Sequence, residues 1–157
     1  MLELYGDALQ ALEHSALGHL ARHSAWIFTL ANLLHVLGAA LVLGSIAVFD
    51  IQVLLRRGWV AAQTGRVAIP LAAFGLALQV PTGLVLLAAE ASALGRNPAF
   101  YAKLAFIVLG LLNLAVVHLR FRDVLGTDVP DGARAFAAVS LMAWTATLIA
   151  GRLIAYL

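Results

Sequence analysis

The sequence predicts an all-α integral membrane protein, a four-helix transmembrane bundle with an N-terminal amphipathic helix. Hydrophobic residues make up 63% of the 157 residues and charged residues only 11%, whereas a soluble domain carries about 25% charged residues. The mean hydropathy is +0.97, and the charges leave four long uncharged stretches. We therefore expect a single transmembrane domain, 1–157, with too little polar surface for a water-soluble globule.

An amphipathic helix is predicted over 2–20, where leucines stand among polar residues, at Leu2, Leu4, Leu9, Leu12, Leu17 and Leu20. Such a helix can lie in the membrane interface or pack over the mouth of the bundle, and the sequence leaves both open. It carries His14, and it places His19 and His23 one helical turn apart, a spacing that can bind copper or zinc. Because no third ligand accompanies them, an exposed interfacial face is the favoured interpretation.

Four membrane crossings follow, predicted near 26–49, 67–89, 99–119 and 135–156. Each has about 20 residues, which at about 1.5 Å per residue spans a hydrocarbon core of about 30 Å. Helices are predicted because backbone groups in lipid must be hydrogen-bonded within their own segment.

Glycine and polar residues predict the connections between the crossings. Residues 56–58 and 64–66 predict a loop before the second crossing, with Pro70 in the first turn of that crossing. Pro81 lies further inside and is expected to kink the helix. The polar stretch 126–132 predicts the loop between the third and fourth crossings.

Arginine is concentrated in the loops after the first and third crossings, which hold Arg56, Arg57, Arg66, Arg120, Arg122 and Arg134. Because basic loops stay in the cytoplasm, the sequence predicts that both termini lie on the outer side of the membrane. Asp50 is then expected to end the first crossing at the cytoplasmic edge and to pair with a loop arginine.

Ionisable side chains at membrane depth are candidate functional groups because they are costly to bury there. His35 lies about nine residues into the first crossing on a face of small and polar residues, so we expect that face to contact protein. Gln79 lies at a similar depth in the second crossing. One interpretation is a hydrogen bond from His35 to Gln79 or to a threonine, joining two helices. The other is that His35 is the axial ligand of a haem b iron.

Two cations lie within about a helical turn of the predicted outer surface, Lys103 in the third crossing and Arg152 in the fourth. They can reach lipid headgroups, pair with Glu90, or hold the propionates of a porphyrin whose iron lies at His35. His118 lies about 12 Å from the level of His35 by straight-helix counting, too far for one haem to bridge both. The sequence therefore shows no second axial ligand.

Several chemistries are excluded by what the sequence lacks. It has no cysteine, which excludes disulfides, thiolate metal sites and iron–sulfur clusters. The net charge of +2, without any arginine-rich or lysine-rich run, gives no basis for nucleic-acid binding. The HExxH, GxSxG, P-loop and GxGxxG motifs are absent.

The chain resembles a family of uncharacterised bacterial four-helix inner-membrane proteins over nearly its whole length. The residues that carry the resemblance are Leu34-His35-Val36-Leu37-Gly38, Gly44-Ser45, Asp50, Pro70, Thr82-Gly83, Asn97-Pro98-Ala99-Phe100-Tyr101-Ala102-Lys103-Leu104, Asn113, Ser140-Leu141, Trp144, Gly151-Arg152 and Ala155-Tyr156.

More distantly, the chain is similar to HemJ-type protoporphyrinogen oxidases and to copper-resistance D membrane proteins. In the HemJ group a histidine and a lysine in matching places serve porphyrin chemistry, and the resemblance implies this for His35 and Lys103. Whether the chain is an enzyme stays open.

Three hypotheses follow. The first is a haem-binding or porphyrin-binding membrane protein with an electron-transfer role, using His35, Lys103, Arg152 and Gln79. The second is an accessory or assembly subunit without a cofactor, packed against another membrane protein or a second copy of itself. The third is a transporter of a small molecule or metal ion.

Overall fold

The structure is a computed structural model, and it describes residues 2–121, 129–130 and 132–157. Within these residues the chain forms α-helices and no strands. The helices are α1 (Leu2–Glu13), α2 (Ala16–His23), α3 (Ala25–Leu54), α4 (Gly58–Ala89), α5 (Ala91–Leu94), α6 (Pro98–Phe121) and α7 (Ala133–Leu153). The predicted all-α fold is confirmed.

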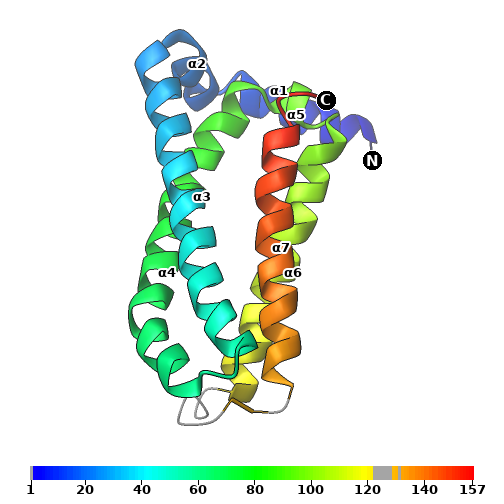
Figure 1. Cartoon of the computed structure of the whole chain (residues 1–157). Coiled ribbons are helices and arrows are strands. Elements are labelled where there is room, and N and C mark those ends of the chain that lie inside the picture. Colours follow the sequence, from blue (N-terminus) through cyan, green and yellow to red (C-terminus); the bar gives the residue numbers. More distant parts are fainter. Residues whose placement is uncertain (1, 122–128, 131) are drawn as a thin grey trace.

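The four long helices form two antiparallel hairpins. Helix α3 packs along α4, α6 packs along α7, and α3 also contacts α7, which joins the hairpins (Figure 1). Both termini lie at one end of the bundle together with α1, α2 and α5, which we call the terminal end. The opposite end, with the turn 55–57, the end of α6 and the start of α7, is called the arginine end. Of the predicted loop between α6 and α7, residues 126–128 and 131 lie outside the described part, as does Arg122.

Small residues bring the helices of the first hairpin close together. A Cβ atom added to Gly38 of α3 would lie 2.7 Å from the carbonyl oxygen of Gly75 in α4, and one added to Gly75 would lie 2.8 Å from that of Gly38. Alanine dominates the buried positions, and Trp144 is the one large side chain among the buried hydrophobic residues that the structure describes. Close backbone approach at glycine and alanine is typical of helix packing in membranes.

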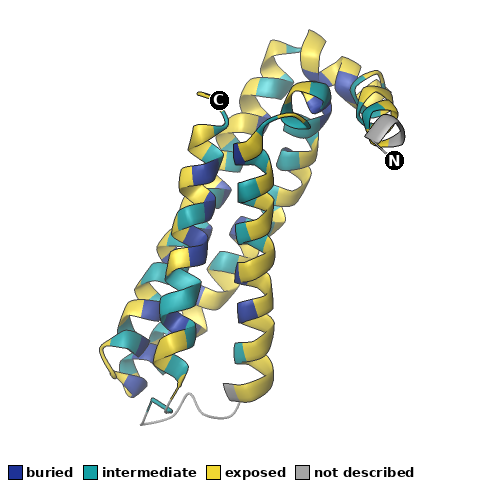
Figure 2. Ribbon diagram, turned by 90° about the vertical axis from the view of Figure 1, so that its right-hand side faces the viewer, coloured by how far each residue is buried: buried dark blue, intermediate teal, exposed yellow. Residues whose placement is uncertain are grey.

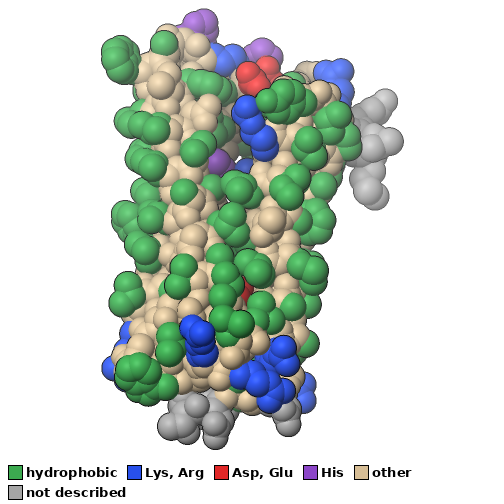
Figure 3. Space-filling view, viewed as in Figure 1, with side chains coloured by type: hydrophobic (Ala, Val, Ile, Leu, Met, Phe, Trp, Pro, Cys, Tyr) green, Lys and Arg blue, Asp and Glu red, His purple; other side chains and the backbone are tan. Residues whose placement is uncertain are grey.

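Large apolar side chains point outward instead of inward. Leu30, Leu33, Val36, Leu112 and Leu114, for example, are each more than half exposed. Exposed residues cover the outer surface along the bundle (Figure 2), and hydrophobic side chains cover the middle of the face seen in Figure 3. Within the part of the chain that the structure describes, helices α3, α4, α6 and α7 are each long and apolar enough to cross a membrane, which confirms the number of such helices that the sequence predicts.

The first hairpin is longer than predicted. Helix α3 continues to Leu54 and α4 begins at Gly58, so the predicted loop at 64–66 is helix and Pro70 lies well inside α4. The reason is that Gly58, Ala61, Gly65 and Ala68, at helical spacing, form one buried face. Glycine and polar residues in this stretch are therefore packing positions and not helix breakers.

The N-terminal segment forms two helices where a single helix over 2–20 was predicted. The Ser15 side chain donates a hydrogen bond to the carbonyl of Leu12 (2.6 Å) and accepts one from the amide of Gly18 (3.2 Å), so it ends α1 and caps α2. Gly18 lies against the end of α4, where a Cβ atom would come 2.7 Å from the carbonyl oxygen of Ala88.

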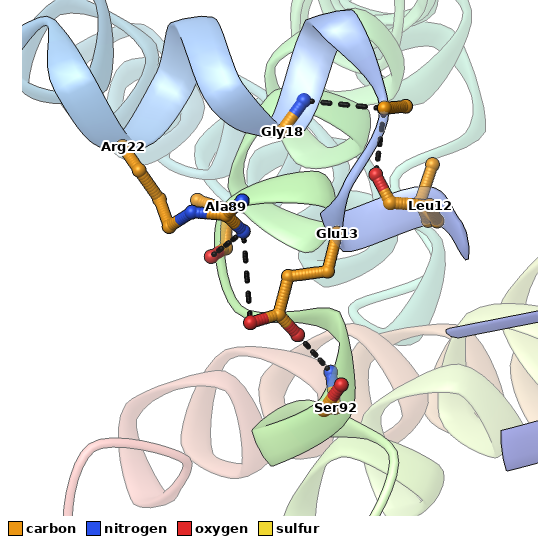
Figure 4. A network of polar contacts seen from close by, with 7 residues as sticks. Leu12, Glu13, Gly18, Arg22, Ala89 and Ser92 are labelled. Atoms are coloured by element: carbon orange, nitrogen blue, oxygen red, sulfur yellow. Dashed lines mark hydrogen bonds and ion pairs between the residues drawn. The ribbon is translucent and has the colours of Figure 1, made fainter. Parts of the chain in front are cut away.

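Polar contacts fasten these short helices to the terminal end of the bundle (Figure 4). The Glu13 carboxylate accepts a hydrogen bond from the amide of Ser92 in α5 (2.9 Å) and lies 3.6 Å from the Arg22 guanidinium. Arg22 also donates to the carbonyl of Ala89 at the end of α4 (3.3 Å). These contacts place α1 and α2 across the ends of α4 and α5.

Candidate functional site

The imidazole of His35 lies between helices and does not point away from the bundle. Helix α3 positions it opposite α4, where Nδ1 lies 3.1 Å from the hydroxyl oxygen of Thr82. Gly83 of α4 leaves room for the ring, since a Cβ atom there would lie 3.1 Å from Cε1 of His35. The predicted hydrogen bond to a threonine that joins two helices is thus present.

The other ring nitrogen contacts the second hairpin. Nε2 of His35 lies 3.2 Å from Nζ of Lys103, which extends from the first turns of α6. The lysine stem passes beside α7, because a Cβ atom added to Gly151 would lie 3.6 Å from Cδ, Cε and Nζ of Lys103. His35 and Lys103 therefore bridge the two hairpins.

The donors and acceptors of this cluster fix the tautomer of the imidazole. An ammonium group has only donors, so Lys103 donates and Nε2 of His35 accepts. Nδ1 then carries the proton and donates to Thr82, whose hydroxyl donates onward to the carbonyl of Leu78 (2.6 Å). The result is a series of hydrogen bonds that runs from the Lys103 ammonium group through the neutral imidazole of His35 and the Thr82 hydroxyl to the backbone of α4.

Gln79 supports the backbone next to this chain. Its side-chain amide donates to the carbonyl oxygen of His35 (3.4 Å), and its Cγ lies close to Gly38. Gln79 therefore holds α3 against α4, and its side-chain amide is directed to the backbone of His35 and not to the imidazole ring.

Arg152 is not part of the cluster. Its guanidinium donates to the Tyr156 hydroxyl (2.9 Å) and lies 5.2 Å from the centre of that ring. Within the described residues the only ion pair joins Arg22 and Glu13. The suggested pairing of Lys103 or Arg152 with Glu90 is therefore wrong. Lys103 extends inward to His35, and Arg152 contacts Tyr156 one helical turn further along the chain.

The remaining histidines lie apart from His35. His118 is exposed near the end of α6 at the arginine end, and His14, His19 and His23 are exposed at the terminal end. The rings of His19 and His23 are 4.0 Å apart, and within the described ranges no three metal-ligating side chains are grouped.

Asp50 is placed differently from the prediction. Because α3 continues for another turn, the carboxylate lies inside the bundle with 4% of the residue exposed, and it accepts a hydrogen bond from the Ser140 hydroxyl of α7. Among the residues that the structure describes, no loop arginine pairs with it. Asp50 lies three residues before Val53, which is also buried, and this helical spacing was the signal that could have placed the acid in the interior.

Comparison of the chain with protein-family models, with curated proteins and with solved structures found no match.

Proposed function

We propose that α3, α4, α6 and α7 cross the bacterial inner membrane, with the arginine end in the cytoplasm and both termini in the periplasm. Outward-facing apolar side chains support the insertion. Arg56, Arg57, Arg120 and Arg134, all exposed at the arginine end, support the orientation.

We further propose that the protein binds haem b or a related porphyrin at His35, between its two hairpins. The observation that carries this proposal is the position of Nε2, which faces the second hairpin and accepts a hydrogen bond from a long, flexible lysine side chain. An imidazole nitrogen in that position becomes available to iron when the lysine moves aside.

The residues around His35 fit the requirements of an axial ligand. Metal-binding histidines usually donate their other N–H to a fixed partner, which sets the tautomer and the ring orientation, and Thr82 is such a partner here. Lys103, once released from Nε2, supplies a cation for a propionate, and Arg152 supplies another from the end of α7. A bound haem iron would supply one-electron chemistry.

The absorption spectrum of protein purified from haem-supplied cells tests this proposal. We expect a Soret band in the wild type and in His118→Ala, and its loss in His35→Ala. His118 is the matched control because it is an exposed histidine near the other end of the bundle. A colourless wild-type protein, or a band that survives in His35→Ala, would overturn the proposal.

A further inference from the structure

A cavity of about 650 Å³ lies between the four long helices, in the half of the bundle nearer the arginine end. This volume is within the range of small-molecule sites, about 300–1,000 Å³. Neither His35 nor Lys103 lines it, so it is separate from the candidate porphyrin site. Its walls are mostly apolar, and its polar lining residues are Ser45, Asp50, Asn113, His118 and Ser140.

Two polar atoms of described residues in this lining lack hydrogen-bond partners. Asp50 and Ser45 are 4% and 7% exposed, and within the described residues neither Oδ2 of Asp50 nor Oγ of Ser45 has a partner. The two residues lie five positions apart on α3 and both line the cavity. Buried polar atoms without partners are unfavourable, and a buried carboxylate without a cation is more so. The cavity therefore presents an acceptor and a hydroxyl to whatever enters it.

The charge of the lining favours one class of ligand. Among the described residues that line the cavity there is no lysine or arginine. Arg134, the nearest arginine of α7 in sequence, donates instead to the carbonyl of Leu54 (3.1 Å) and is exposed. A ligand that brings both a positive charge and N–H donors satisfies Asp50 completely, whereas a neutral alcohol satisfies only its hydrogen bond.

We propose that this cavity binds lipophilic amines in their ammonium form, with the N–H groups donating to Asp50 and Ser45 and the apolar body lying against the alanine-rich walls. Such a ligand differs from a porphyrin in charge and shape. The two proposals can therefore fail independently.

Trp144 lines the cavity and reports on its contents. The chain has three tryptophans, and the other two, Trp26 and Trp59, are 85% and 66% exposed. Replacing these two with phenylalanine leaves Trp144 as the only fluorophore of its kind. In phosphatidylcholine nanodiscs, ω-bromooctylamine should quench its fluorescence saturably, because bromine quenches on contact.

The Asp50→Asn variant in the same background should bind the bromoamine about tenfold more weakly or worse, the loss expected for a charge-assisted hydrogen bond. Glu90→Gln removes an exposed acid at the terminal end and should leave the affinity unchanged. His35→Ala should also leave it unchanged, which separates this site from the porphyrin site.

Matched measurements with ω-bromooctanol, the uncharged counterpart of the amine, test whether the positive charge of the ligand matters. Equal amine affinity in the wild type and in Asp50→Asn would overturn the proposal, as would saturable binding of the alcohol as tight as that of the amine. If Asp50→Asn does not fold, Ser45→Ala serves in its place, and it should weaken amine binding while leaving the weak response to the alcohol unchanged.

Discussion

At the scale of single residues, the imidazole of His35 is held at both nitrogens by groups from different helices. Thr82 of α4 fixes Nδ1 and Lys103 of α6 occupies Nε2. The two partners are unequal, because a threonine hydroxyl has one short rotor and a lysine has a long flexible stem. This inequality gives the ring a fixed side and an exchangeable side.

Removal of the fixed partner should destabilise the bundle. Thr82→Val keeps the volume but removes the hydroxyl that Nδ1 of His35 contacts, so we expect a loss of about 1–3 kcal/mol in the free energy of unfolding. Thr145→Val, at an exposed position of α7, is the control and should change little. Denaturant titration of both variants in lipid micelles makes the comparison, and equal stabilities would contradict the assigned contact.

The sequence located His35 and Gln79 at similar depth but could not decide which partner the imidazole takes. That choice depends on how α3 and α4 are rotated about their axes, which Gly38 and Gly75 determine through backbone contact. Arg152 was grouped with Lys103 by depth alone. Its side chain turns to Tyr156, and depth along a helix carries no information about direction.

At the scale of helices, the contact between α3 and α4 depends on glycine. Gly38→Ala should force the helices apart and cost about 1–3 kcal/mol, because the new methyl group would lie 2.7 Å from the Gly75 oxygen. Gly44→Ala, on the same helix, meets nothing within 4 Å and should be neutral or stabilising by up to about 1 kcal/mol. Unfolding free energies of the two variants test this, and similar values would show that the close approach is absent.

The docking of the short helices depends on pH through Glu13. Hydrogen bonds from Ser92, aided by Arg22, hold the pKa of the Glu13 carboxyl below its ordinary value of 4.5. A carboxyl whose pKa is lower in the folded than in the unfolded state stabilises the fold above the unfolded value. This contribution is lost as the pH falls through the folded value.

Amide exchange measures this dependence. The protection factor of the Ser92 amide, which donates to Glu13, should fall when the pH drops below 4.5 and through the folded pKa. In Glu13→Gln the protection should no longer vary over that range, while Glu90→Gln should behave as the wild type. A protection factor that stays constant in the wild type would contradict the role given to Glu13.

Helix boundaries were the weakest part of the sequence prediction. The long stretches without charged residues predicted the number of long helices correctly. The start of α4 was predicted nine residues late because the stretch 58–66 contains two glycines, an arginine and other polar residues. Gly58 and Gly65 are instead buried positions of α4, where the absence of a side chain lets the helix pack closely against its neighbours. The end of α3 was predicted five residues early, at 49 instead of Leu54, and this separate error placed Asp50 at the edge of the bundle instead of in its interior.

At the scale of the whole molecule, the proposed orientation places the arginine end in the cytoplasm. The chain has no cysteine, so single cysteines can report on each end. Asp7→Cys at the terminal end should react with a membrane-impermeant maleimide in cells with a permeabilised outer membrane. Arg57→Cys, in the turn after α3, should react only after lysis. The reverse pattern would contradict the orientation.

The overall account rests on a histidine enclosed by two helical hairpins, and solid-state NMR of ¹⁵N-labelled protein without cofactor in bilayers tests it most directly. We expect a neutral His35 ring protonated at Nδ1, with a through-space contact between Nε2 and Nζ of Lys103. A His35 ring that shows contacts to lipid acyl chains and none to Lys103 would contradict the account.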